Sequence, residues 1–474
     1  MRSTVPPASA LDRHNGESLP RQLARHIKAW IAQQRCPPGH RLASVRDLAR
    51  RHGLSTQTVA DAYALLIASG LVVSRRGAGY YVAEAHRAAA TESAPGEQLD
   101  PRRLRGEVSA HPASVVRLGA GLPADWHDTP LLEAAWRKFA RRGLARFGDY
   151  GATRGHESLR TGLSRTLHAA GIQASAADIL LTTGATQAID LVVRQLVHPG
   201  DTVLVEDPGY FQTHWAIRAQ GARAVGVPRT AQGPDPDALA RLCQDMKPRL
   251  FFTQSALQNP TGSALALPVA YEVLRVAERH DLLVVEDDVS GDLAPPHLPR
   301  LAMLDQLRRV LYVGSFSKTL PPGLRVGYLA TRRAALLETL TQTKLVSTFV
   351  SSEMNESFVH AIMEDGVYAR HVQSIRERLA DRAKSATARL RAMGFEPEPD
   401  HVFQGGTFLW MQHPDHPDAR RLADGAAARG IFLAPGCAFR PGQEASPHLR
   451  FALPLCTAPS LDALSDYLQD LRRP

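Results

Sequence analysis

Residues 313–330 read VGSFSKTLPPGLRVGYLA, and one lysine, Lys318, stands between serines and a Pro-Pro-Gly turn directly after an apolar run. The chain has 56 lysines and arginines, of which only six are lysines. Arginine keeps its proton and cannot attack a carbonyl, so a position that needs a nucleophilic amine requires lysine. Taken alone, Lys318 fits an ordinary surface lysine. The surrounding residues distinguish that reading from a nucleophilic amine in a binding site.

Short apolar runs alternate with longer amphipathic segments from about residue 116 onward. The runs are ILLTT (179–183), TVLVE (202–206), RLFFT (249–253), LLVVE (282–286) and VLYVG (310–314). This alternation predicts an α/β domain with a buried, mostly parallel sheet. In such sheets ligands bind at the carboxyl ends of the strands, so the residues after each run belong together.

Polar or glycine-rich residues follow these runs. They are Gly184-Ala185-Thr186, Asp207-Pro208-Gly209-Tyr210, Gln258-Asn259-Pro260-Thr261-Gly262, Asp287-Asp288 and Ser315-Phe316-Ser317-Lys318. Because the carboxyl ends of parallel strands share one edge of the sheet, we expect one site rather than several. Each motif alone also fits a routine turn, and it is their convergence at one edge of the sheet that indicates a ligand site.

Several of these groups suit a phosphate. Gly184, Ala185 and Thr186 open a predicted helix and present backbone N–H groups and a hydroxyl. Ser315 and Ser317 precede the lysine and offer two hydroxyls. Arg325 follows it and offers a guanidinium that can bind the same phosphate through two hydrogen bonds.

The remaining groups suit a flat aromatic ring. Tyr210 can stack on such a ring, although a loop aromatic packed on the core is the plainer reading. Asn259 can donate to a phenolate oxygen, and Asp287 can keep a pyridinium nitrogen protonated. A phosphate cradle, a stacking tyrosine, a carboxylate for a ring nitrogen and a lysine together describe pyridoxal 5'-phosphate (PLP). The acidic pair Asp287-Asp288 has no histidine or third acid within motif distance, so no metal site is predicted.

Composition limits the class of protein. At 474 residues, 44% hydrophobic and 22% charged, the chain is typical of a globular protein with two or three domains. No apolar run approaches membrane-spanning length, and the N-terminus lacks the apolar core of a signal peptide. The four scattered cysteines fit a reducing cytosol rather than a disulfide scaffold, so we expect a cytoplasmic protein.

Charge divides the chain unevenly. The net charge is +9, and residues 15–83 carry ten lysines and arginines against three acidic residues, a net +7. A small basic module joined to a nearly neutral large one suggests a polyanionic partner. We expect an N-terminal tail (1–14), a DNA-binding domain (15–83), an Ala/Glu/Pro/Ser-rich linker (84–115) and the large domain (116–474).

The small module has a helix-turn-helix pattern. Ser55 is a good N-cap, and an apolar stripe follows at Val59, Ala62, Tyr63 and Leu66. The first turn, Thr56-Gln57-Thr58, is small and uncharged, which suits contact with base edges. Two apolar runs then bracket Arg75-Arg76-Gly77, a hairpin tip typical of a wing. An ordinary three-helix module with a solvated basic face is the alternative, and the wing and the charge disfavour it.

Residues 116–474 resemble a fold-type I PLP-dependent aminotransferase domain, with a large mixed, mostly parallel sheet and a smaller C-terminal α+β subdomain. The matching segments are YGATRGHESLR, TTGATQAI, EDPGY, QNPTG, EDD, SFSK…GLRVGY, GGTFLW and HLRFALP, in the family's order. The resemblance implies that Lys318 forms the Schiff base with PLP and that Asp287 pairs with the ring nitrogen. It also implies that Asn259 faces the ring hydroxyl and Tyr210 stacks on the ring.

The same resemblance assigns three further roles. Arg325 with Ser315 would bind the phosphate, Arg450 would take a carboxylate of the substrate or effector, and Tyr150 would reach the site of a neighbouring subunit. The sequence departs from the family at VEDDVSGDL, because Ser290 stands where related proteins carry a tyrosine that bonds the ring hydroxyl. A serine is too short for that contact, which puts catalytic turnover in doubt but not cofactor binding.

Residues 37–82 resemble the winged helix of the GntR family, with PPGHRLASVRDLA matching its opening. Arg46 then falls on the family's DNA-contacting arginine. Family members often carry arginine where this chain has Thr56 and Ala60, so the operator sequence does not transfer from relatives. A GntR-type reader, a linker and an aminotransferase-like domain together resemble the MocR-type regulators.

The expected function is therefore transcriptional regulation: a homodimer, arranged head to tail, that binds double-stranded operator DNA and senses PLP, alone or with an amino effector. A working aminotransferase with an accessory DNA-binding domain is the alternative, and a DNA-binding scaffold with an empty pocket is a weaker one. Ser290 weighs against the enzyme; Lys318, Asp287, Arg325 and Arg450 weigh for it. The effector, the operator, the sign of regulation and the target genes are not specified by the sequence.

Overall fold

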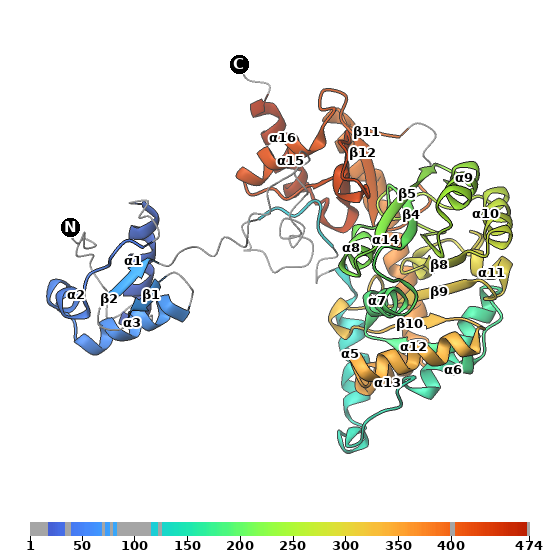
Figure 1. Ribbon diagram of the computed structural model, residues 1–474, viewed down its shortest axis with the longest axis horizontal. Helices are drawn as coiled ribbons and strands as arrows, with labels where there is room; N and C mark the ends of the chain where they lie inside the picture. The colour runs from blue at the N-terminus through green and yellow to red at the C-terminus, as the bar shows by residue number, and fades with distance from the viewer. Residues whose placement is uncertain are drawn as a thin grey trace. The chain divides into compact units, whose positions relative to one another are not determined.

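The structure is a computed structural model that describes residues 18–33, 39–68, 72–75, 79–82, 115–121, 126–398 and 403–471. The chain divides into two units, Met1–Glu97 and Gln98–Pro474 (Figure 1). The expected tail (1–14) and all of the expected linker except residue 115 lie outside the described residues. No helix among the described residues is both long and apolar enough to span a membrane.

The small unit contains three helices and a two-stranded hairpin: α1 (Leu19–Gln33), α2 (Val45–His52), α3 (Thr56–Ala68), β1 (Val72–Arg75) and β2 (Gly79–Val82). Helix α2 begins at Ser44, whose side chain accepts the N–H of Asp47 at 3.1 Å, and ends at Gly53 in the left-handed conformation. In β1 and β2, which pair antiparallel, Val72 lies opposite Val82.

One buried residue joins the parts of the small unit. Tyr63 of α3 is 1% exposed, its ring stacks on Tyr80 of β2 at 4.1 Å, and its hydroxyl donates to the Ala43 carbonyl at 2.7 Å. Val59, Ala62 and Leu66 are buried on the same helix face, as the apolar stripe predicts. Because α3 buries this face, its first turn is left to face solvent.

The large unit is built on an eight-stranded sheet in the order β3-β10-β9-β8-β7-β4-β5-β6. Its strands are β3 (Ile179–Thr182), β4 (Thr202–Asp207), β5 (Arg223–Thr230), β6 (Gly233–Pro234), β7 (Leu250–Thr253), β8 (Leu283–Asp287), β9 (Val310–Ser315) and β10 (Gly327–Ala330). The contiguous pairs from β9 through β8, β7 and β4 to β5 are parallel, whereas β10 is antiparallel to both β3 and β9. The sheet is thus mixed but mostly parallel, as expected, and the five predicted runs are β3, β4, β7, β8 and β9.

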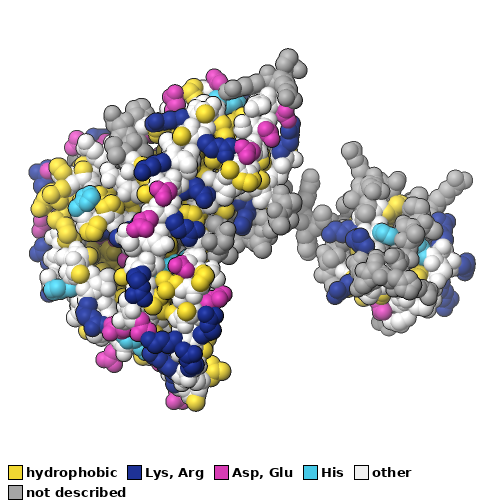
Figure 2. Space-filling view, turned by 180° about the vertical axis from the view of Figure 1, so that it is seen from behind, with side chains coloured by type: hydrophobic (Ala, Val, Ile, Leu, Met, Phe, Trp, Pro, Cys, Tyr) yellow, Lys and Arg dark blue, Asp and Glu magenta, His cyan; other side chains and the backbone are white. Residues whose placement is uncertain are grey.

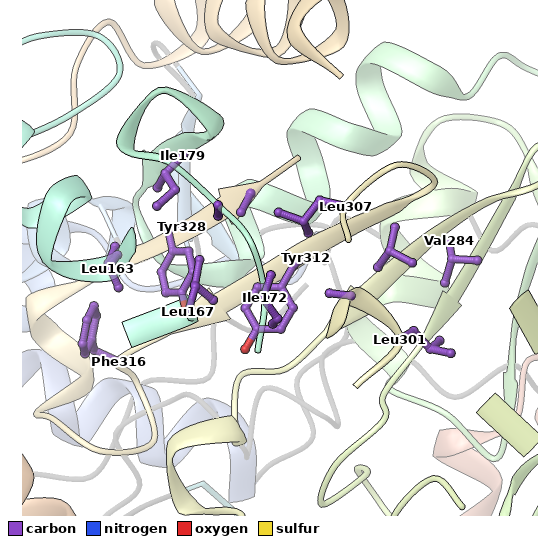
Figure 3. Close-up of a cluster of buried hydrophobic side chains, with 14 of the residues drawn as sticks. Leu163, Leu167, Ile172, Ile179, Val284, Leu301, Leu307, Tyr312, Phe316 and Tyr328 are labelled. Carbon is purple, nitrogen blue, oxygen red and sulfur yellow. The ribbon is translucent and has the colours of Figure 1, made fainter. Parts of the chain in front are cut away.

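Helices cover both faces of this sheet, which explains why its strands are continuous apolar runs. One face packs on α7 (Gly184–Leu196), α8 (Phe211–Ala219) and α12 (Ala334–Ser347). The other packs on α5 (Thr129–Ala140), α6 (Glu157–Ala169), α9 (Pro236–Met246), α10 (Leu267–Arg279), α11 (Leu301–Asp305) and α13 (Glu353–Glu364). Figure 3 shows part of this second core, where Tyr312 and Tyr328 of neighbouring strands lie beside Leu167 and Ile172.

A smaller α+β subdomain follows the long helix α14 (Val367–Ala392). Its antiparallel sheet has the order β11-β12-β14-β13, and its elements are β11 (Glu396–Pro397), β12 (Phe408–Gln412), α15 (Ala419–Ala428), β13 (Ala434–Pro435), β14 (His448–Ala452) and α16 (Ala458–Leu471). Its core includes Leu118 and Trp126 from the start of the large unit. The chain segment that follows the expected linker is therefore part of this subdomain.

Candidate functional site

Strand register brings three of the sequence motifs, TTGATQAI, SFSK and GLRVGY, to one edge of the large sheet. Gly327 at the start of β10 lies opposite Thr182 at the end of β3 and Ser315 at the end of β9. Helix α7 begins two residues after Thr182, so its N-terminus lies beside Gly327, where an added Cβ would come within 2.8 Å of the Ala185 nitrogen. The absence of a side chain at Gly327 is what permits this approach.

Arg325 lies against the beginning of α7. Its Nη2 donates to the Thr183 carbonyl at 3.2 Å, and a Cβ on Gly184, which has φ +75°, would come within 2.4 Å of the same nitrogen. Ala185 is buried and Thr186 exposed in the first turn of the helix. Helical N–H groups, a hydroxyl and a guanidinium thus converge as a phosphate cradle requires.

Ser315 and Ser317 form a small hydrogen-bonded pair before Lys318. The Ser315 hydroxyl donates to the Ser317 hydroxyl at 3.1 Å, and the Ser317 N–H donates back to it at 3.2 Å. This arrangement fixes the turn that carries Lys318, and the Lys318 Nζ lies 5.6 Å from the centre of the Phe408 ring.

Asp287 is buried at the end of β8 with one satisfied oxygen. Gln254 donates to its Oδ2 at 2.9 Å, whereas Oδ1 has no hydrogen-bond partner among the described residues. Burial, and then the nearby Asp288, raise the pKa of Asp287 to about 7, although the Gln254 hydrogen bond and Lys318 oppose the shift. A buried carboxylate oxygen without a donor fits a protonated ring nitrogen, so the residues present fit PLP.

Gln254 is a residue of the site that the sequence analysis did not predict. Its Oε1 accepts the Asn259 N–H at 2.8 Å, so the same amide fixes both the predicted ring-nitrogen partner Asp287 and the predicted ring-hydroxyl partner Asn259. The available signal was its place directly after the run RLFFT, where the rule about strand ends points.

Arg450 of β14 reaches the same site from the small subdomain. It is 1% exposed; its Nη1 donates to Asn259 Oδ1 at 2.9 Å and its Nη2 to the Gly119 carbonyl at 2.7 Å. Its guanidinium lies 4.2 Å from the centre of the Phe408 ring, the ring that Lys318 also contacts. Because Asn259 Oδ1 accepts from Arg450, its amide nitrogen is the group that can donate to a ligand.

Tyr210, Gln254 and Asp287 line one cavity at the ends of β4, β7 and β8. The Tyr210 ring contacts Phe211 at 5.1 Å between ring centres, tilted by 59°. The structure thus brings Tyr210 beside Asp287, where stacking on a ring bonded to that carboxylate is possible.

Ser290 and Tyr150 are the two remaining positions that the sequence singled out in the large unit. Ser290 is buried in the turn that precedes the 3-10 helix Gly291–Leu293. The hydroxyls of Tyr312 and Tyr368 donate to Asp288 and Asp292, the acidic residues two positions before and after Ser290. Tyr150 is 81% exposed and packs edge-on against Phe349 at 5.0 Å.

The predicted DNA-reading residues lie at the exposed start of α3. Ser55 accepts the Thr58 N–H at 3.0 Å as the N-cap, and Thr56 and Gln57 are exposed; Gln57 donates to Asp61 at 2.8 Å. Arg46 is exposed on α2. The Arg75 side chain, Arg76 and Gly77 lie outside the described residues.

Charge on the small unit agrees with a polyanionic partner. The face in Figure 2 shows lysine and arginine side chains with few acidic ones, against a mixture of both signs on the large unit. Within the described ranges, no group of histidine, cysteine, aspartate and glutamate could hold a metal ion.

Known proteins match both units. Residues 113–468 match the family model for aminotransferase class I and II, and residues 19–82 match the model for bacterial regulatory proteins of the gntR family. The chain is 27% identical to the uncharacterized HTH-type transcriptional regulator YdfD of Bacillus subtilis, covering 91% of this chain and 92% of that one. It is also 27% identical to the probable rhizopine catabolism regulatory protein MocR of Rhizobium meliloti, covering 80% of this chain and 79% of that one.

A solved structure has the same large-unit fold. The α-aminoadipate aminotransferase LysN of Thermus thermophilus, in complex with N-(5'-phosphopyridoxyl)-L-leucine, superposes with a TM-score of 0.69 at 27% identity, covering 78% of this chain and 95% of that one. The chain belongs to the aminotransferase class I and II family, and its GntR-type helix-turn-helix domain makes it a transcriptional regulator of the MocR type.

Proposed function

We propose that the large unit binds PLP through Lys318 and that the bound cofactor, alone or with an amino compound, controls how tightly the small unit binds operator DNA. The observation that carries this proposal is the buried Asp287, whose Oδ1 lacks a partner among the described residues in a site that also holds Lys318. The fold alone would be compatible with an empty pocket, but a buried carboxylate oxygen without a donor is costly unless a ligand supplies one.

Each neighbouring residue has a part in holding the cofactor. The N-terminus of α7 with Ala185 and Thr186, the serines Ser315 and Ser317, and Arg325 would bind the phosphate. Tyr210 would stack on the ring, Asn259 would donate to the ring hydroxyl, and Asp287 would hold the proton on the ring nitrogen. When bound, PLP supplies an aldehyde that condenses with amino groups and a ring that withdraws electrons.

Arg450 gives the effector a chemical class. A buried guanidinium beside Asn259 and Phe408 favours a ligand that carries a carboxylate in addition to an amino group. The N-(5'-phosphopyridoxyl)-L-leucine bound by the Thermus enzyme combines both groups with the cofactor, so we propose it as a probe for this chain. Regulation requires that the ligand bind the DNA-competent and DNA-incompetent arrangements unequally.

DNA binding in this proposal rests on the first turn of α3, Arg46 and the wing. Arg46, Ser55, Thr56, Gln57, Thr58, Arg75, Arg76 and Gly77 are the proposed contacts. A head-to-tail homodimer would present two such units to repeated half-sites. Its interface would include an apolar rim made of Tyr150, Leu345, Val346 and Phe349, which are 81%, 43%, 89% and 49% exposed in the single chain. With DNA as its target, we propose that the protein acts in the cytoplasm.

A working aminotransferase is the second candidate. Lys318, Asp287, Arg325 and Arg450 favour it because the site retains an amine nucleophile, a ring-nitrogen partner and a carboxylate clamp. Ser290 disfavours efficient turnover, since no tyrosine stands there to bond the ring hydroxyl.

The deciding experiment is a footprint of the purified protein on DNA upstream of its own gene, with and without PLP and then with candidate amino acids. Protection whose strength or extent changes with PLP supports the regulator. Absence of protection under all conditions, together with steady amino transfer to a keto acid, would favour the enzyme instead.

A further inference from the structure

The chain segment that enters the large unit from the linker is held by backbone hydrogen bonds to the small subdomain. Four such bonds are formed, namely Val116 N–H to the Gly430 carbonyl (2.9 Å), Phe432 N–H to Val116 (2.7 Å), Gly119 N–H to Phe432 (3.0 Å) and Ala452 N–H to Leu118 (2.7 Å). We call residues 115–121 the entry segment. It forms an isolated parallel bridge with the small subdomain at Val116 and Ile431, and in the sequence it begins at the last residue of the expected linker.

Gly119 is the tightest point of the entry segment. A Cβ at this position would lie 2.4 Å from the Ala434 nitrogen and 2.8 Å from the Leu433 carbonyl carbon. Backbone meets backbone here, so neither side has a flexible side chain that can yield. The Gly119 carbonyl is thereby held where it accepts the Nη2 group of Arg450 at 2.7 Å.

Arg450 is a buried cation, and two of its nitrogens donate to neutral oxygen acceptors. Its Nη1 and Nη2 donate to the amide oxygen of Asn259 and to the Gly119 carbonyl. The bonds to Asn259 and Gly119 are charged on the donor side only, whereas a carboxylate carries a full negative charge and can bind the guanidinium through two parallel N–H groups. Any such pair of donors includes Nη1 or Nη2, so a bound carboxylate shares a nitrogen that now serves Asn259 or Gly119 and draws the guanidinium toward itself.

We infer that Arg450 couples the effector site to the entry segment, with the Gly119 carbonyl as the group that a ligand carboxylate displaces. The inference rests on the proposed function, since it requires a cofactor-linked ligand in the site. Loss of the Arg450 bond loosens the Gly119 carbonyl and the backbone bonds beside it, so ligand binding alters the segment that leads to the linker. An amine without a carboxylate leaves that bond in place.

The coupling is reciprocal. If a carboxylate ligand changes the affinity for DNA by some factor, then bound DNA changes the affinity for the carboxylate ligand by the same factor. Couplings between sites in proteins typically correspond to about 5- to 150-fold in affinity, and we expect a value in that range.

Two ligands that differ by one carboxylate test the inference. The first is N-(5'-phosphopyridoxyl)-L-leucine, and the second is the same adduct made with 3-methylbutylamine, which is leucine without its carboxylate. The full chain is saturated with each, and amide hydrogen exchange is followed by mass spectrometry over the entry segment and residues 430–434 and 448–452. The leucine adduct should speed exchange at the Gly119, Phe432 and Ala452 amides about fivefold or more over the amine adduct. Equal exchange with both bound ligands would overturn the inference and leave the proposed function standing.

Two variants sharpen the result. Arg450→Lys keeps the charge but not the planar fork, so the two adducts should then give the same exchange. Gly119→Ala places a methyl group against the Ala434 backbone, so fast exchange should appear without any ligand, while adduct binding shows that the site is still folded. Slow exchange in ligand-free Gly119→Ala would contradict the role of the entry segment. If neither adduct binds the wild-type chain, the proposed cofactor site itself is wrong, and this inference falls with it.

Discussion

Gln254 holds Asp287 by one oxygen only: its Nε2 donates to Oδ2 at 2.9 Å, and Oδ1 is left without a donor among the described residues. Asp287→Asn keeps the shape of the side chain but removes the charge that would hold a protonated ring nitrogen. Hydrogen bonds to charged groups contribute about 1.5–3 kcal/mol, so we expect PLP to bind roughly 10- to 100-fold more weakly. Titration of the cofactor's visible absorbance measures this, and unchanged affinity would remove Asp287 from the site.

The same carboxyl predicts a pH dependence of the cofactor-free chain. Its pKa is about 7 in the folded protein against the usual 3.8, so between these values the folded chain holds a proton that the unfolded chain has lost. The contribution of Asp287 to stability is therefore complete below about pH 4 and is lost as the pH rises toward 7.

Asp287→Asn isolates this contribution, because the neighbouring Glu286, whose pKa burial also raises to about 7, is present in both proteins. Thermal unfolding from pH 5 to 7 should show wild type losing more stability than the variant over this window. Parallel curves would show that Asp287 is ionised in the cofactor-free fold.

Lys318→Arg separates charge from chemistry. Arginine retains the positive charge near Asp287 and Phe408 but cannot condense with an aldehyde. We expect the variant to bind DNA as the cofactor-free wild type does, to lose the visible absorbance band of bound PLP, and to show no change in its DNA footprint when PLP is added. A footprint that still responds as in wild type would mean that covalent attachment is not the signal.

Much of this fold follows from a local signal. The runs at 179–183, 202–206, 249–253, 282–286 and 310–314 mark β3, β4, β7, β8 and β9 because strands buried on both faces lack polar alternation. Strand β10 was not predicted, because its residues stand out in the sequence only as part of the motif GLRVGY. Its antiparallel position between β3 and β9 cannot be inferred from local periodicity.

The site likewise contains residues that the sequence predicts and a contact that it does not. Lys318, Asp287 and Asn259 stand directly after apolar runs or within family motifs, so their convergence was accessible from the sequence. The bond between Arg450 and Gly119 was not, because it joins a side chain to a backbone carbonyl 331 residues away, and a carbonyl carries no sequence signature. Packing of the small subdomain alone brings them together.

The apolar rim predicts how the chain assembles. Val346 is 89% exposed next to Leu345 and Phe349, so Val346→Asp should place a charge in the proposed homodimer interface and shift the protein to monomer. Sedimentation analysis measures this, with Leu267→Asp as the matched control because Leu267 is 46% exposed at the start of α10. A dimer that survives Val346→Asp but not Leu267→Asp would put the interface on α10 instead.

The wing makes the last prediction. Arg75 is the last residue of β1, and Arg76 follows it in the sequence before β2, so we expect their guanidinium groups to contact DNA phosphates. Each phosphate contact releases condensed counterions, so the logarithm of affinity falls with the logarithm of salt by about 0.9 per contact. Arg75→Ala/Arg76→Ala should therefore weaken binding to all sequences and flatten this slope by about 1 to 2. The control is Arg165→Ala/Arg194→Ala, which removes two arginines of the large unit that pair with Glu364 and Asp190 and should leave the slope as in wild type. A slope unchanged by the wing variant but flattened by the control would move the phosphate contacts from the wing to the large unit.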